Sequence, residues 1–188
     1  RLAASFKKQY PEVSFEIEIG DSHEITERVL GHDLILGFTG ARPESEKIKA
    51  KEFLSDRLVL AASSEIVKKD RLSFKELLDL PFILREKGSG TRKTMEVFLG
   101  KKGIAIKDLN VVACLGSTDS IKEALKATLG VSIISKIAIE EELRQGVLRE
   151  IKLKGLDIRR NFYIISLKKR TLPLIYKRFY EYVLSEAG

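Results

Sequence analysis

The sequence predicts an α/β fold, because short apolar runs alternate with segments of helical periodicity along most of the chain. Two stretches show this most clearly. The apolar run Phe82–Leu84 is followed by Gly88-Ser89-Gly90 and by a helical pattern that opens at Thr91. The run Leu109–Cys114 leads into Gly116-Ser117 and another helical pattern. Because strands alternate with helices, we expect mostly parallel sheets.

The N-terminal third contains two predicted helices and two predicted strands. Leu2, Phe6 and Tyr10 have helical spacing, and Pro11 closes that helix. The segment Val13–Ile19 alternates apolar and polar residues, which indicates a strand with one covered face. Asp21-Ser22-His23-Glu24 is typical of a helix start, with Asp21 as the cap. Leu34–Thr39 is apolar throughout and predicts a central strand of a parallel sheet.

The rest of the chain continues the alternation, with a change of character after Ser63-Ser64. Ser73 and Glu76 have the spacing of a capping box ahead of a short helix. The other expected strands are 57–62, 130–135, one starting at 146, and 161–167; the other expected helices are those opening at 91 and 117, 137–143 and 172–184.

Composition limits the class of protein. Of the 188 residues, 44% are hydrophobic and 32% are charged, with a net charge of +7, which describes an ordinary globular domain. Lysines are interspersed with glutamates, so the positive surplus indicates a solvated surface more than a nucleic-acid footprint. No apolar run approaches the 20 or so residues of a membrane span and no signal peptide is visible, so we expect a cytoplasmic protein. The single Cys114 excludes an intramolecular disulfide and is expected to be a small core residue.

The two glycine-serine turns predict a site for an anion or a carboxylate. A glycine turn lets a ligand approach the backbone, and a helix N-terminus presents unpaired N–H groups with the positive end of the helix dipole. The alternative is that the serines are plain N-caps in turns that bind nothing. Arg92 could add a charge, although an arginine on a helix is more often solvent-facing, and Arg85, Lys87 and Lys136 are weaker candidates. The expected donors are the hydroxyls of Ser89, Thr91, Ser117 and Thr118 and the backbone N–H groups of Gly90 and Thr118.

Enzymatic, metal and cofactor functions have little support. Only His23 and His32 could act as imidazole bases, and both are expected to be exposed. Neither serine lies in a G-x-S-x-G motif, and Gly88–Lys93 fits neither a phosphate-loop nor a Rossmann spacing. The clustered ligands of a metal site are also missing. The sequence therefore predicts no catalytic residue, no metal and no cofactor.

The order of these motifs resembles the effector-binding (regulatory) domain of LysR-type transcriptional regulators over essentially the whole chain. Each motif is weak alone, but their order and spacing are specific. The motifs are Phe6-x-x-x-Tyr10-Pro11-x-Val13, Gly20 before a helix, Leu30-Gly31-His32-Asp33-Leu34, Leu58–Ala61, Leu80–Ile83 with Gly88–Arg92, Gly116-Ser117, Leu129–Ile134 and Gly146-x-Leu148.

The resemblance implies a periplasmic-binding-protein-like fold of two α/β lobes joined by two crossing strands. Lobe one would comprise residues 1–62 and 163–188, and lobe two residues 63–162. The family's first strand of lobe one and its DNA-binding head are expected to be missing here. A small anionic effector would bind between the lobes. The effector-binding residues would be Ser22 and Thr39 from lobe one and Ser89, Gly90, Thr91, Gly116, Ser117 and Thr118 from lobe two.

The same resemblance implies a regulatory role. The domain would form a homodimer, within a tetramer of the full-length protein, and would reach DNA only through the missing head. The expected pairing surfaces are residues 2–19 of one copy and helix 117–128 of the other. The Gly-Ser-Gly-Thr-Arg form with Gly20-Asp21 favours the branch linked to sulfur or selenium metabolism. The alternatives are a solute-binding protein that transports a small anion, and an enzyme built on the same fold.

Overall fold

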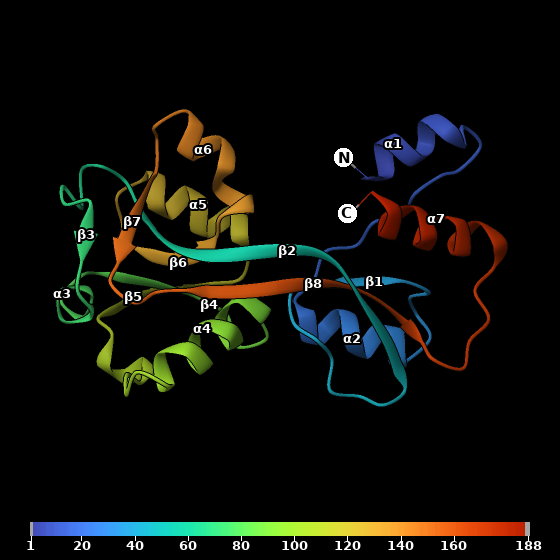
Figure 1. The fold of residues 1–188 in the computed structure, drawn as a ribbon, viewed down its shortest axis with the longest axis horizontal. Helices are drawn as coiled ribbons and strands as arrows, with labels where there is room; N and C mark the ends of the chain where they lie inside the picture. Colours follow the sequence, from blue (N-terminus) through green and yellow to red (C-terminus); the bar gives the residue numbers. More distant parts are fainter. Residues whose placement is uncertain (1, 187–188) are drawn as a thin grey trace. The chain divides into compact units, whose positions relative to one another are not determined.

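The computed structural model describes residues 2–186, which divide into two compact units (Figure 1). Unit 1 contains the residues up to Ser55 and those from Asn161 onward, and unit 2 runs from Asp56 to Arg160. Both boundaries lie within long strands, β2 (Ile48–Ala62) and β8 (Ile158–Leu167), so these two strands are the elements that pass from one unit to the other. The boundaries expected from the sequence, 62/63 and 162/163, fall at the end of β2 and inside β8.

Unit 1 packs helices against both faces of β8. The side chains of Ile164 and Ile165 are neighbours in the strand and therefore point to opposite faces. Ile165 packs with α2, whereas Ile164 packs with α7. The N-cap Asp21 accepts hydrogen bonds from the backbone N–H groups of His23 and Glu24, which confirms the predicted helix start. The elements of unit 1 besides β2 and β8 are α1 (Leu2–Gln9), α2 (Ser22–Leu30), β1 (Gly37–Thr39) and α7 (Leu174–Ser185).

The strand predicted over Val13–Ile19 is wrong. This segment pairs with no strand among the described residues, although its apolar alternation is strand-like. A strand needs a hydrogen-bonded neighbour, and alternation supplies only the covered face. Val13 and Phe15 are half-buried, while Ile17 and Ile19 remain exposed, with 70% and 92% of their surface accessible.

The prediction of mostly parallel sheets is also wrong. The predicted central parallel strand Leu34–Thr39 is reduced to β1, a terminal strand that runs antiparallel to β8. In unit 2, β2 runs antiparallel to both β6 and β7. Parallel pairing is found for β3 with β7, for β4 with β5, and at an isolated bridge between Phe82 and Val131. The predicted helices between the strands are present, but the long strand β2 runs in the opposite direction to its neighbours β6 and β7.

Unit 2 contains most of the elements predicted after residue 63. The predicted capping box is confirmed, since the backbone N–H of Ser73 donates to the Glu76 carboxylate and that of Glu76 to the Ser73 hydroxyl. The remaining elements are β3 (Arg71–Leu72), α3 (Phe74–Leu78), β4 (Phe82–Arg85), α4 (Gly90–Gly100), η1 (Ile106–Asp108), β5 (Val111–Leu115), α5 (Thr118–Lys126), β6 (Ser132–Ser135), η2 (Ile137–Ile139), α6 (Glu140–Arg144) and β7 (Arg149–Leu153).

The core of unit 2 has two sides because its strands alternate. In β4, Phe82 and Leu84 pack on one face with Met95 and Leu99 of α4, whereas Ile83 packs on the other with α5. Figure 1 shows α4 on one side of these strands and α5 with α6 on the other. Strand β4 is thus covered on both faces, and the helices α4 and α5, which follow β4 and β5, start at one edge.

Candidate functional site

Two helix N-termini meet at one edge of unit 2. Strands β4 and β5 are parallel neighbours, with Arg85 opposite Leu115 at their carboxyl ends, so the turns that follow them lie at the same edge. Helix α4 begins there at Gly90 and α5 begins at Thr118. This confirms the strand-turn-helix pattern predicted twice from the sequence.

The two serines of these turns act as N-caps. The Ser89 hydroxyl accepts from the backbone N–H of Arg92 at 3.4 Å, and the Ser117 hydroxyl accepts from that of Ser120 at 3.0 Å. Both hydroxyls thus have the structural role that the sequence offered as the alternative to ligand binding. Gly90 is the first residue of α4, and Gly116 precedes the cap of α5.

The two threonines that follow the caps are each held by an arginine. Nη1 of Arg160 donates to the hydroxyl of Thr91 at 2.8 Å, and Nη1 of Arg85 donates to the hydroxyl of Thr118 at 2.7 Å. A hydroxyl that accepts one hydrogen bond keeps its own hydrogen to donate to another acceptor. The arginines therefore orient Thr91 and Thr118 as hydroxyl donors beside two helix N-termini.

Each of these arginines is paired with a carboxylate. Arg160 donates from Nε to Asp56 at 2.9 Å, and both side chains are almost fully buried. Burial lowers the pKa of the Arg160 guanidinium; the charge of Asp56 opposes this effect and the positive charge of Arg85 adds to it. Arg85 donates from Nε and Nη2 to the two oxygens of Glu86, at 2.8 and 2.7 Å. The site therefore holds two guanidiniums within electrostatic range, each balanced by one carboxylate.

Arg92 and Cys114 differ from their predicted environments. The Arg92 side chain was expected to face solvent, but it is largely buried, because it donates to Glu96 and to the backbone carbonyl of Arg85. It thereby ties α4 to the end of β4. Cys114 was expected in the core and is exposed. Among the described residues, strand β5 pairs with β4 alone and is partly open to solvent, so its apolar sequence does not imply burial.

The predicted site residues of unit 1 serve local structure. The Ser22 hydroxyl accepts from the backbone N–H of Gly40 at 3.2 Å, and the buried Thr39 hydroxyl donates to the carbonyl of Ala41 at 2.9 Å. Both bonds fix the turn that follows β1. A role of Ser22 and Thr39 in effector binding stays a prediction.

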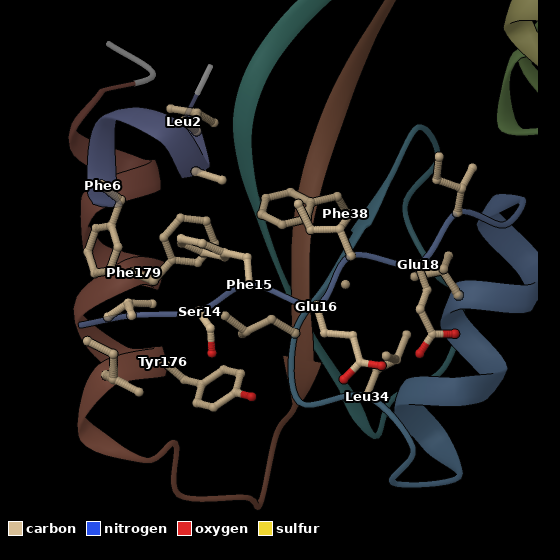
Figure 2. A pocket seen from close by; sticks show the side chains of 18 of the residues that line it. Leu2, Phe6, Ser14, Phe15, Glu16, Glu18, Leu34, Phe38, Tyr176 and Phe179 are labelled. Carbon is tan, nitrogen blue, oxygen red and sulfur yellow. The ribbon is translucent and has the colours of Figure 1, made fainter. Parts of the chain in front are cut away.

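A cavity of about 950 Å³ opens elsewhere, within unit 1 (Figure 2). Segment 12–20, β1 and α7 form its walls, and the ring of Phe15 contacts that of Phe179 with centroids 5.2 Å apart. Figure 2 shows these rings beside Phe6 at one end of the cavity and Glu16 and Glu18 farther along segment 12–20. Glu12, Ser14 and Tyr176 add further polar groups to a lining that is mostly apolar, and no lysine or arginine is found among the described lining residues. Carboxylates in the lining repel an anion, so this lining does not favour an anionic ligand.

Arg160 and Asp56 are the functional candidates that the sequence analysis missed. They are 104 residues apart and have no local motif. The only signal is that each charge stands beside an apolar stretch of a crossing strand, Asp56 before Leu58–Ala62 and Arg160 before Phe162–Leu167. His23 and His32 are exposed, as predicted.

Over residues 2–186, no group of three or more histidines, cysteines or acidic residues is placed to hold a metal ion. A helix long and apolar enough to cross a membrane is also not found in that range.

Comparison with known proteins identifies the fold and the family. The family pattern described as "LysR substrate binding domain" matches residues 1–188. The HTH-type transcriptional activator CmpR of Synechocystis is 32% identical over 187 residues, covering 98% of this chain and 60% of CmpR. The HTH-type transcriptional regulator CbbR of Sinorhizobium medicae is 29% identical over 190 residues, covering 100% of this chain and 60% of CbbR. The chain thus spans about 60% of the length of these relatives.

A solved relative gives the same answer in three dimensions. The regulatory domain of Synechocystis CcmR, in complex with 2-PG, superposes with a TM-score of 0.88 and 25% identity, covering 100% of this chain and 89% of that chain. The fold is therefore the periplasmic-binding-protein-like α/β fold that the sequence predicted, and the named relatives are transcriptional regulators and not enzymes. The chain belongs to the family of LysR substrate-binding domains, the effector-binding domains of LysR-type transcriptional regulators.

Proposed function

We propose that this regulatory domain binds a small anionic effector at the N-termini of α4 and α5 in unit 2. The observation that carries the proposal is the alignment of Thr91 by Arg160 and of Thr118 by Arg85, which presents two hydroxyl donors at one strand edge. The backbone N–H groups of the first helical turns add further donors, because they have no intrahelical acceptor. The effector residues proposed here are Ser89, Gly90, Thr91, Gly116, Ser117 and Thr118, joined by Arg85 and Arg160.

The effector class follows from the donor set. Hydroxyls, amides and guanidiniums all donate, so the matching ligand accepts several hydrogen bonds at once, as a carboxylate or phosphate does. The solved CcmR relative is a complex with 2-PG, and this compound is the first probe to test here. A catalytic step has no support, because neither histidine lies near these residues in the sequence and the relatives are regulators.

In the full-length protein, we propose that the domain relays effector binding to DNA. Both curated relatives described above carry HTH in their names, and each is longer than this chain. The homodimer, its pairing through residues 2–19 and helix α5, the tetramer and the cytoplasmic location belong to this proposal. The names of the relatives favour it over transport of a solute. The sulfur or selenium branch remains a prediction, which the probes below test.

Thermal-shift and calorimetric titration with 2-PG, inorganic phosphate, sulfate, thiosulfate, selenite, O-acetylserine and aromatic acids test the site. Thr118→Val and Thr91→Val keep the side-chain shape and remove one hydroxyl donor each. A lost hydrogen bond to a charged ligand is worth about 1.5–3 kcal/mol, so we expect the affinity of a binding probe to fall about 10- to 100-fold. Thr171→Val, at an exposed position in unit 1, is the matched control. Unchanged affinity in both site variants would refute the proposed site.

A further inference from the structure

Three ion pairs involve arginines in or beside the proposed site, namely Arg85–Glu86, Arg92–Glu96 and Arg160–Asp56, and the first of these is the one most able to open. Asp56 is fully buried and also accepts from the backbone N–H of Arg57, so its pair with Arg160 is fixed. Glu96 lies one helical turn from Arg92, whose guanidinium is anchored on the carbonyl of Arg85. Glu86 differs, because the two hydrogen bonds of its carboxylate both go to Arg85, its neighbour in sequence.

The backbone of Glu86 is held while its side chain can leave. Its N–H donates to the carbonyl of Leu115 at 3.1 Å, and its carbonyl accepts from the N–H of Ser89 at 3.1 Å. The side chains of Arg85 and Glu86 are 15% and 25% exposed, so the carboxylate has a path to water. Rotation of the Glu86 side chain therefore breaks two hydrogen bonds without disturbing the turn between β4 and α4.

The bond between Arg85 and Glu86 has the geometry of a bound ligand. Two N–H groups of one guanidinium point at the two oxygens of one carboxylate, and a carboxylate or phosphate ligand takes the same fork. The third nitrogen, Nη1, meanwhile holds the hydroxyl of Thr118. A ligand that reaches Thr118 therefore arrives beside a fork already occupied by a carboxylate of the protein.

We propose that Glu86 is a built-in competitor of the anionic effector, which must displace the Glu86 carboxylate from Arg85 in order to bind. This inference rests on the proposed function. A tethered carboxylate acts at a high effective concentration, so a ligand with one negative charge displaces it poorly and a ligand with two does so better. Glu86 thereby raises the effector concentration needed for binding, and dianions such as phosphate esters reach that threshold more readily because the guanidinium attracts them more strongly.

The size of the effect follows from the strength of the pair. A partly exposed ion pair that holds Arg85 in the paired state about four-fifths of the time leaves about one-fifth of the molecules competent to bind. Removal of the competing charge should then tighten binding about fivefold. The same factor applies to every ligand that needs the freed guanidinium, so carboxylate and phosphate probes should gain equally.

The test is calorimetric titration of the 188-residue chain and its variants with 2-PG, with inorganic phosphate and with acetate. We expect Glu86→Gln to lower the Kd about fivefold, and Glu86→Asp, whose carboxylate reaches one methylene group less far toward Arg85, to lower it by a smaller factor. Glu96→Gln is the matched control, since it removes an equal charge from another arginine, and its Kd should stay within about twofold of the wild type. Thermal unfolding of each variant without ligand checks that it is folded.

The outcomes separate the two proposals. If the wild type binds a probe, Thr118→Val weakens that binding, and Glu86→Gln binds as well as or more weakly than the wild type, then Glu86 positions Arg85 and competition is refuted while the site stands. If Glu96→Gln tightens binding as much as Glu86→Gln does, the higher affinity comes from the change in overall charge, and competition is again refuted. If neither the wild type nor Glu86→Gln binds any probe, both proposals fail for this ligand class.

Discussion

Replacement of Arg160 by methionine should destabilise unit 2 strongly. The substitution keeps an aliphatic side chain and removes the guanidinium that Asp56 and Thr91 both contact. It leaves the Asp56 carboxylate, whose side chain has no exposed surface, with the backbone N–H groups of Arg57 and Ile137, at 2.8 and 3.5 Å, as its donors among the described residues. Loss of one partner of a buried pair typically costs about 3–5 kcal/mol, a large share of the roughly 5–15 kcal/mol that stabilise an ordinary domain.

A double variant tests whether the cost comes from the uncompensated charge. In Asp56→Asn/Arg160→Met, the amide that replaces the carboxylate is neutral and still accepts from the N–H of Arg57. Most of the stability should therefore return, with about 1 kcal/mol remaining for the donor that Thr91 has lost. The difference between the double variant and the sum of the single ones is the coupling free energy of the pair.

The positions of the tyrosines allow the unfolding of unit 1 to be followed separately in urea denaturation. All five tyrosines lie in unit 1 and the chain has no tryptophan, so tyrosine fluorescence follows unit 1 in urea, whereas far-ultraviolet circular dichroism follows helices of both units. We expect Arg160→Met to shift the dichroism transition. A loss below about 1 kcal/mol, or a double variant less stable than both single variants, would refute the assignment of Asp56–Arg160 as a charge pair that unit 2 depends on.

Two further predictions concern packing and pH. A methyl group on Gly130 would lie 2.4 Å from the Pro81 carbonyl oxygen, which also accepts from the N–H of Val131. Gly130→Ala should therefore lower the free energy of unfolding in urea by about 1–3 kcal/mol. Gly100→Ala, at the end of α4 with open space around it, is the control and should raise the free energy of unfolding by up to about 1 kcal/mol. Hydrogen bonds from Lys69 and Ser73 lower the pKa of Glu76 from 4.5 to about 2. The stability this provides is present above the ordinary pKa and is lost as the pH falls toward about 2, so the melting temperature of Glu76→Gln should lie below that of the wild type at neutral pH and converge with it in acid. A difference that persists unchanged at acid pH would contradict this linkage.

Local patterns in the sequence identified the elements of unit 2 because each has a local cause. The Ser73 capping box, the buried run Phe82–Leu84 and the serine caps of α4 and α5 are all encoded within a few residues. Strand direction was not predictable in this way, since β2 pairs antiparallel with β6 and β7, which lie far along the chain, as Ala61 opposite Ser132 illustrates. The segment Val13–Ile19 shows the same limit: its alternation is real, but pairing requires a neighbour that its own sequence cannot supply.

In the candidate site, too, the residues with a local sequence signal were predictable and their long-range partners were not. Thr91 and Thr118 were found because glycine-serine turns and helix starts are local, whereas the arginines that orient them were undervalued or missed. Arg85 and Thr118 are 33 residues apart, and Arg160 and Thr91 are 69 residues apart. Long-range partners of this kind become visible only when the strands of unit 2 are placed side by side.

The cavity of unit 1 has a consequence for the handling of the isolated chain. The open edge of β1 and segment 12–20, which pairs with no strand among the described residues, flank a mostly apolar recess, a combination that invites strand exchange between molecules and precipitation. Glu12 and Glu16 interrupt the apolar residues of this rim and act as gatekeepers through mutual repulsion between copies. Concentrated samples should therefore stay clear longest at low salt, where the repulsion between these carboxylates is unscreened.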